Sequence, residues 1–162
     1  MSITIKLSRV DNRLLHATVA LNWNQFINAN YVIVVDPDYI DDPFIASVMQ
    51  LSLPKTMKVK IFNVEQALHF LQEDTGAARK VMVIFKDLKT ARQAVEKGFR
   101  TKELQLPYPA SRIVIKNLMD YFSKEEIADI RFIQSNGIRL FFQTAPMDNK
   151  EYAIFTKPDR NG

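Results

Sequence analysis

Residues 31–51, YVIVVDPDYIDDPFIASVMQL, decide the fold class of this chain. Tyr31 to Val35 form a continuous β-branched run, which is typical of a parallel strand buried on both faces. A helix begins shortly after it, because Asp42 stands at the N-cap position and Pro43 at the first helical position. The apolar residues that recur at helical spacing, and that we expect to be its buried stripe, are Phe44, Ile45, Val48 and Leu51.

The same unit of strand followed by helix repeats along the chain. Further strands are predicted at 3–7, 59–62, 81–85 and 138–142, with a shorter apolar piece at 104–106. Helices are predicted between Leu15 and Ile27, with Trp23 and Phe26 in the core, and after the capping residues Asn63, Asp87 and Ser123. This alternation implies right-handed crossovers. We therefore expect an α/β fold: a single three-layer domain over residues 1–162, with an open, mostly parallel sheet and helices on both faces.

The first strand does not follow the pattern of a doubly buried strand. Its odd-numbered residues 3–7 are apolar, whereas Thr4, Lys6 and Ser8 are polar. We expect Thr4 and Ser8 to be small enough to lie beneath a helix, and Lys6 to extend its ammonium group to solvent.

Composition excludes several classes of protein. With 162 residues, 47% of them hydrophobic and 25% charged, the chain is long and apolar enough to bury a core, so disordered and fibrous classes are excluded. The chain has no cysteine, which excludes disulfide scaffolds and thiol chemistry. A net charge of +4 without a basic tract is weak evidence for nucleic acid, which we do not expect as a partner.

Because there is no signal segment and no long apolar run, we expect a cytoplasmic protein that serves any membrane process by docking.

Chemistry-bearing residues gather directly after the first strand. Arg9, Asp11, Asn12, Arg13 and His16 lie where a helix is expected to begin, and ligands of open α/β sheets bind at such carboxyl ends of strands. A neutral imidazole can attack phosphorus, helix-start N–H groups can hold phosphate oxygens, and an arginine can neutralise their charge. The set therefore suits a phosphoryl carrier. A purely structural role, with Asp11 as an N-cap, is also open, and the residue types alone slightly favour it.

The segment Arg9-Val-Asp-Asn-Arg-Leu-Leu-His16 resembles the R-[IV]-D-x-R-L-[IL]-H signature of the IIB domains of the mannose/fructose/sorbose family of the bacterial phosphoenolpyruvate:sugar phosphotransferase system. The resemblance covers about residues 2–145 and includes Tyr31–Asp36, Lys80–Lys86 and Ala94–Gly98. It implies that His16 is the phosphorylated residue, that Arg13 contacts the phosphate, and that Asp11 is the motif carboxylate. We also assign phosphate binding to Arg9, Asn12 and Ala17, and place Arg112 either there or on the surface.

This resemblance implies a phosphocarrier that takes a phosphoryl group from a IIA protein and passes it to a sugar during uptake by membrane IIC and IID proteins. No metal or organic cofactor is implied, and a homo-oligomer is left open. The chain departs from the family pattern at Ala17 and Thr18, at Pro37, and in the glycine-free stretch 105–109. These departures motivate the alternative, a non-catalytic regulatory or binding module that keeps the fold.

Two other groups of polar residues have simpler interpretations. His69, the second histidine, lies in a predicted helix and is interpreted as structural or solvated. The carboxylates at 36, 38, 41 and 42 lack the pattern of a calcium loop, and Asp42 already has a capping role. Tyr108, between Pro107 and Pro109, is expected to be exposed near the site.

Overall fold

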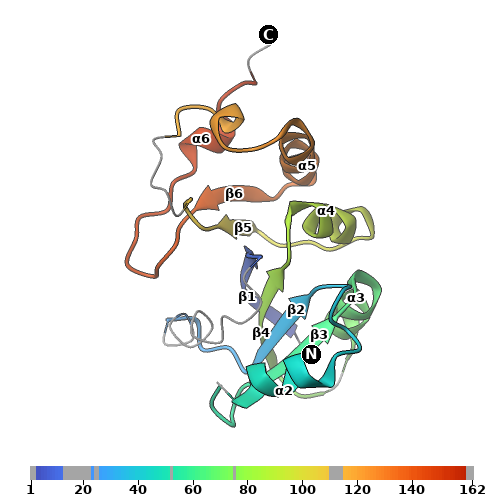
Figure 1. Ribbon diagram of the computed structural model, residues 1–162. Helices are drawn as coiled ribbons and strands as arrows, with labels where there is room; N and C mark the ends of the chain where they lie inside the picture. Colours follow the sequence, from blue (N-terminus) through green and yellow to red (C-terminus); the bar gives the residue numbers. More distant parts are fainter. Residues whose placement is uncertain are drawn as a thin grey trace.

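The computed structural model describes residues 3–12, 23, 26–51, 53–74, 76–109 and 115–159, and its centre is one six-stranded sheet (Figure 1). The strands lie in the order β3-β2-β4-β1-β5-β6, and every neighbouring pair is parallel. Their bounds are β1 (Ile3–Val10), β2 (Tyr31–Val35), β3 (Lys58–Phe62), β4 (Arg79–Phe85), β5 (Glu103–Leu106) and β6 (Arg139–Phe142). The predicted α/β class with an open parallel sheet is confirmed.

The helices lie on both faces of this sheet. Their bounds are α2 (Pro43–Leu51), α3 (Val64–Gln72), α4 (Leu88–Glu96), the 3-10 helix η1 (Leu118–Asp120), α5 (Lys124–Ser135) and α6 (Ala153–Thr156). We call the side covered by α3, α4 and α5 the first face, where one core cluster lies (Figure 1). On the opposite, second face, α2 and Trp23 pack over β2 and β4 in a separate cluster.

The capping residues recognised in the sequence begin the helices of the first face. Asn63 accepts a hydrogen bond from the Gln66 N–H at 2.8 Å, Asp87 one from the Thr90 N–H at 2.7 Å, and Ser123 one from the Glu126 N–H at 3.1 Å. These side chains pair donors that the first turn of a helix otherwise leaves without an intrahelical partner.

The predicted buried stripe of α2 is wrong at its two ends. Phe44 is 72% exposed and Leu51 is 85% exposed, and both lie on the outer side of the helix. Met49 is the buried residue, and Ile45 packs partly against the core of the second face. This helix has apolar residues on two sides, so helical spacing alone does not determine which side the sheet covers. Trp23 is buried as predicted, whereas Phe26 is exposed, against the prediction.

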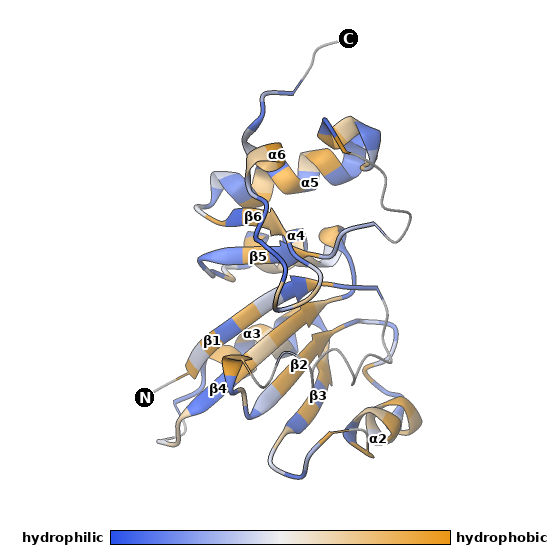
Figure 2. Ribbon diagram, turned by 90° about the vertical axis from the view of Figure 1, so that its left-hand side faces the viewer, coloured by the Kyte–Doolittle hydropathy of each residue, from blue (hydrophilic) through white to orange (hydrophobic). Residues whose placement is uncertain are grey.

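The first strand differs from the expectation as well. Ser8 is buried and Lys6 is exposed, both as predicted, but Thr4 is exposed and therefore does not lie beneath a helix. The pairing with β4 shifts between Ile5 and Leu7, which leaves Lys6 as an extra residue in a β-bulge. Figure 2 shows the alternating hydropathy of β1, in contrast to the mostly apolar β2, which lies on the other side of β4.

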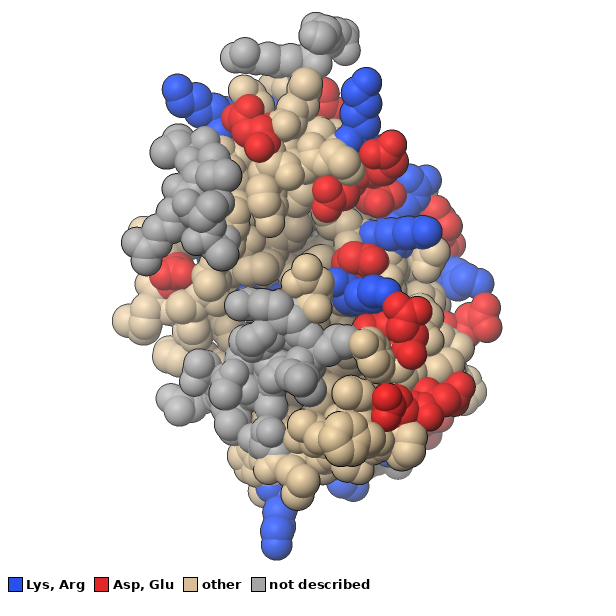
Figure 3. Space-filling model, viewed as in Figure 1, with Lys and Arg blue, Asp and Glu red and all other residues tan. Residues whose placement is uncertain are grey.

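Charged side chains of both signs alternate over the helices of the first face (Figure 3). Lys97 on α4 pairs with Glu65 on α3 at 3.1 Å, and Arg92 on α4 pairs with Asp129 on α5 at 3.1 Å. Such pairs contribute little to stability individually, but they leave no continuous basic surface on this side. Among the described residues, no helix is long and apolar enough to cross a membrane.

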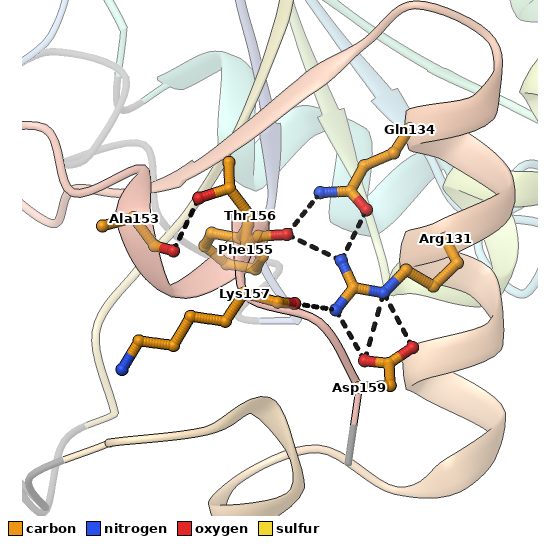
Figure 4. Close-up of polar contacts among 7 residues, drawn as sticks. All are labelled: Arg131, Gln134, Ala153, Phe155, Thr156, Lys157 and Asp159. Carbon is orange, nitrogen blue, oxygen red and sulfur yellow. Dashed lines mark hydrogen bonds and ion pairs between the residues drawn. The ribbon is translucent and has the colours of Figure 1, made fainter. Parts of the chain in front are cut away.

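The C-terminal segment is held against α5 by Arg131 (Figure 4). The Arg131 guanidinium donates to the carbonyl oxygens of Phe155 and Lys157, at 2.6 and 2.9 Å, and forms an ion pair with Asp159 at 2.6 Å. The hydrogen bond from Arg131 lowers the pKa of the Asp159 carboxyl. This segment includes the short helix α6, and its Phe155 side chain is part of the core of the first face.

Candidate functional site

A hollow of about 150 Å³ lies where the carboxyl ends of three neighbouring strands meet. Asp11 and Asn12 follow β1, Lys86 and Asp87 follow β4, and Pro107 follows β5. β4 and β5 lead to helices of the first face, whereas the chain after β1 leads to Trp23 on the second face. The strand ends around β1 are therefore a topological switch point, where open α/β sheets bind their ligands.

Asp11 is fixed in this hollow by its backbone and by Arg9. Its N–H donates to the Phe85 carbonyl oxygen at 2.9 Å, which continues the β1–β4 pairing by one residue. Its carboxylate accepts a hydrogen bond from Arg9 Nε at 3.2 Å. Arg9 is 1% exposed and Asp11 is 5% exposed, so this ion pair lies in the interior, where a charge requires a partner. Asn12, the next residue, is exposed on the rim of the hollow.

A buried polar network extends from Arg9 to the far edge of the sheet. Arg9 Nη1 donates to Gln105 Oε1 at 2.8 Å and to the Thr144 carbonyl oxygen at 3.2 Å. Gln105 Nε2 then donates to Gln143 Oε1 at 3.1 Å, and Gln143 Nε2 donates to the Asp148 carbonyl oxygen at 2.9 Å. The network thus joins the ends of β1, β5 and β6.

Gln105 and Gln143 are members of this site that the sequence does not predict. The available signal was a glutamine inside the apolar piece Leu104–Leu106 and another directly after the apolar strand β6. A polar residue in such a position needs a hydrogen-bond partner, but the sequence does not say which one.

A pair of carboxylates and a lysine lie at the ends of β2 and β4. Lys86 pairs with Asp38, and this hydrogen bond, together with the charge of nearby Asp36, raises the pKa of the Lys86 ammonium. Asp36 is fully buried; its Oδ1 accepts from the Asp38 N–H at 2.9 Å. Its Oδ2 has no hydrogen-bond partner among the described residues.

Aromatic side chains lie beside the carboxyl end of β5. Tyr108 stacks on Phe142, with ring centroids 5.1 Å apart, and its N–H donates to Thr144 Oγ1 at 2.8 Å. Tyr108 is 41% exposed, as predicted, and partial burial raises the pKa of its hydroxyl. Tyr121, which follows η1, is 45% exposed and lines the hollow itself.

The remaining residues predicted for the site divide into two groups. Arg13, His16, Ala17 and Arg112 lie outside the described residues, and their assigned roles stay predictions. His69 is described: its ring is 81% exposed on α3 and lies 3.4 Å from Glu73, so the interpretation as a solvated residue is confirmed.

The acidic residues after β2 are used locally. Asp42 Oδ1 accepts from the Phe44 N–H at 3.0 Å, so its predicted N-cap role is confirmed, and Asp38 pairs with Lys86. Within the described part of the chain, no group of three or more histidine, aspartate or glutamate residues is placed to hold a metal ion.

Comparison with known proteins identifies the family. The model of the family described as "PTS system sorbose subfamily IIB component" matches residues 5–156. The chain belongs to this family. It is therefore a IIB component of the phosphotransferase system, with the general phosphocarrier role in sugar uptake that this family has.

Named relatives of this IIB component agree with the assignment. The N-acetylgalactosamine-specific phosphotransferase enzyme IIB component 1 of Escherichia coli is 27% identical over 93% of this chain and 96% of its own length. Its crystal structure superposes with a TM-score of 0.76 over 91% of this chain and 98% of that one. The sorbose-specific EIIB component of Klebsiella pneumoniae is 24% identical, with 89% of each chain covered. The IIB domain of the sorbose permease from Klebsiella pneumoniae, 22% identical, has the same fold, with a TM-score of 0.77 over 93% and 94% of the two chains.

Proposed function

We propose that His16 carries the phosphoryl group of this IIB component. In the first step the P–N bond of a phosphohistidine on a IIA protein breaks, and a P–N bond to the His16 imidazole forms. In the second step that bond breaks, the phosphoryl group passes to a sugar hydroxyl, and the hydroxyl proton is taken up by the released His16 imidazole, while membrane IIC and IID proteins hold the sugar. Transfer between two imidazoles is nearly balanced in energy, so the protein supplies alignment and charge neutralisation.

The observation that carries this proposal is the position of residues 9–12, the start of the segment 9–16, in the fold. It begins in β1 and leaves the carboxyl end of that strand between β4 and β5, at the switch point of the sheet. In this segment His16 is the nucleophile, and Arg13 is the charge partner of the phosphate.

Within the proposal, Asp11 and Arg9 have different tasks. Asp11 directly follows β1, and its carboxylate accepts a hydrogen bond from Arg9 Nε. Because the Arg9 guanidinium is buried and bonded to Asp11, Gln105 and Thr144, we assign Arg9 to positioning Asp11 rather than to holding phosphate. Asn12 and Lys86, on the rim of the hollow, are the described polar groups that we assign to the phosphate or to the docking partner.

A IIA protein is the partner that this edge of the sheet would meet. The mannose-specific EIIAB component of Escherichia coli, of which this chain spans 46%, supports a IIA partner. Exposed residues at the carboxyl edge, among them Asn12, Pro37, Asp38 and Tyr108, would be covered during transfer. Such a transient interface is small and is steered by charge.

The test is phosphoryl transfer from phosphoenolpyruvate through the two general carrier proteins and a cognate IIA protein. Wild-type protein and His69→Ala should become labelled to the same extent, and His16→Ala should not. His69 is a matched control because it is the only other histidine and its ring is exposed on α3. The label should be labile in acid and stable in base, as phosphoramidates are. Label that persists in His16→Ala would overturn the assignment.

A regulatory or binding module that keeps the IIB fold is the second candidate. The residues that favour it are Ala17, Pro37 and the stretch 105–109, where the chain departs from the family pattern. This candidate predicts that the IIA protein binds without transferring its phosphoryl group. Binding of phosphorylated IIA with no label on either histidine would favour it over the carrier.

A further inference from the structure

A second hollow, of about 490 Å³, opens at the opposite, amino-terminal end of the sheet, between β1 and the chain around β5. Residues 3–8 of β1 form one wall, residues 100–103 form another, and Phe141 and Lys150 complete it. Among the described residues, β1 and β5 pair only at Arg9 and Gln105. The two strands are therefore paired only near their carboxyl ends. The hollow lies between their amino-terminal parts, where they are not paired. Its volume is in the range of small-molecule sites.

The walls of this hollow carry an excess of positive charge. Four basic residues line it, and the acidic Glu103 pairs with one of them, Lys150, at 3.5 Å. Lys6, Arg100 and Lys102 remain. None of these three forms an ion pair with a carboxylate of the described residues; Arg100 instead donates to the carbonyl oxygens of Val95 and Phe99, at 3.0 and 2.7 Å. The Arg100 guanidinium also donates to Asn136 Oδ1 at 3.0 Å, so it is bound at the ends of α4 and α5. Lys6 and Lys102 are therefore the two cations of this hollow that no carboxylate of the described residues pairs.

The local backbone is shaped to present Lys6. The β-bulge makes Lys6 an extra residue between Ile5 and Leu7, which pair with the consecutive residues Val81 and Met82 of β4. Bulges re-aim a side chain and are frequent beside functional sites. Among the described residues, Lys6 lies in the part of β1 that pairs with β4 alone, so its exposed side chain stands at the open side of the strand, where the hollow lies.

Hydroxyl groups lie beside these cations. Ser8 Oγ donates to Thr101 Oγ1 at 3.4 Å, which links β1 to the chain before β5 at the base of the hollow. Thr4 is exposed in the same wall. A ligand with hydroxyl groups can exchange hydrogen bonds with these side chains, while a dianionic group is the chemistry that two unpaired lysine ammonium groups recognise.

We propose that this hollow binds a small phosphomonoester with a hydroxylated body, such as a sugar phosphate, with the phosphate group held by Lys6 and Lys102. A phosphomonoester carries about −1.5 to −2 charges at pH 7, which matches the uncompensated charge of the hollow. None of the residues that line this hollow lines the hollow at the carboxyl ends of the strands, so binding here is tested separately from phosphoryl transfer.

The experiment is an NMR titration of the ¹⁵N-labelled full chain. The probes are glucose 6-phosphate, inorganic phosphate, glucose, and sodium chloride at matched ionic strength. Glucose 6-phosphate should give saturable shifts at the amides of residues 4–8 and 101–103, and inorganic phosphate should give weaker shifts at the same amides. The double variant with Lys6→Ala and Lys102→Ala should weaken binding of glucose 6-phosphate about tenfold. The double variant with Lys55→Ala and Lys124→Ala, which removes two exposed lysines outside the hollow, should bind like wild type.

Four results would overturn the proposal. Equal shifts with sodium chloride would show a general salt effect, and equal affinity for glucose would remove the role of the phosphate. Unchanged affinity in the Lys6 and Lys102 double variant would remove the role of these lysines. Shifts confined to residues 11–12 and 86–87 would assign the anion to the carboxyl edge of the sheet. None of these results bears on transfer to His16, which is measured separately.

Discussion

Arg9 and Gln105 form the one ladder pair between β1 and β5 in the described part of the chain, and their side chains are also hydrogen-bonded, from Nη1 to Oε1 at 2.8 Å. Gln105 is fully buried and Arg9 is 1% exposed. The side-chain contact at the one paired position of β1 and β5 is therefore a buried hydrogen bond from a charged group rather than an apolar contact. It lies two residues before Asp11, at the edge where we place phosphoryl transfer.

Gln105→Leu should destabilise the protein by about 2–3 kcal/mol, because the Arg9 guanidinium and Gln143 both lose a buried partner. Urea unfolding measures this loss. Gln72→Leu, at an exposed position at the end of α3, is the control and should stay within about 0.5 kcal/mol of wild type. If both variants unfold at the same urea concentration as wild type, the network contributes nothing to stability.

The two sides of α2 should respond differently to substitution. Met49→Ala should cost about 2–5 kcal/mol, because it removes a buried side chain that packs on the second face. Phe44→Ser and Leu51→Ser should change the free energy of unfolding by no more than about 0.5 kcal/mol, since both side chains are mostly exposed. Denaturant unfolding of the three variants distinguishes this arrangement from the stripe that helical spacing predicts, in which Phe44 and Leu51 are the costly positions.

The sequence predicted those parts of the fold that depend on neighbouring residues. The continuous apolar run of β2 and the capping pairs at Asn63 and Ser123 act over a few positions, and the structure has the strand and both helices. The covered side of α2 depends instead on where the helix lies over the sheet. The helix has apolar residues on both sides, so helical spacing alone predicted wrongly that Phe44 and Leu51 are buried.

The polar network was beyond sequence reasoning for a similar reason. Arg9 and Gln105 are 96 positions apart, and Gln105 and Gln143 are 38 positions apart. Only the strand order, which places β5 between β1 and β6, brings these residues together. The sequence indicated the segment 9–16 as the site, but it did not indicate that Arg9 points into the interior, because nothing nearby in the chain shows its partners.

Tyr152 provides a pH-dependent test of the contacts around β5. Burial, followed by its hydrogen bond to Glu103, raises the pKa of Tyr152 to about 12. Because the folded state holds this proton more tightly than the unfolded state, the resulting stability is complete below pH 10.0, the ordinary value, and is lost as the pH rises through about 12. The difference in ultraviolet titration between wild type and Tyr152→Phe should have its midpoint near 12, and Glu103→Gln should lower it. A midpoint near 10 would contradict these contacts.

Arg13 distinguishes a working carrier from a module that has only kept the fold. If Arg13 stabilises the transferring phosphoryl group, its guanidinium does so with two parallel hydrogen bonds, which a lysine does not reproduce. Arg13→Lys should therefore slow transfer from phosphorylated IIA although it keeps the charge, and Arg13→Ala should slow transfer more. The expected scale for the alanine variant is about 3–4 kcal/mol in the barrier, or a few hundred-fold in rate.

Single-turnover transfer measures these rates, and thermal melts show whether the variants stay folded. Lys55→Ala is the charge-matched control, because Lys55 is exposed and follows α2, outside the carboxyl-edge hollow. It removes the same unit of positive charge from a net charge of +4, so any effect of overall charge on the encounter with IIA appears in both alanine variants. A rate loss in Arg13→Ala alone assigns Arg13 to the transferring phosphate. Equal rates in wild type and Arg13→Ala make it a surface charge, and the regulatory module then becomes the better account of this IIB component.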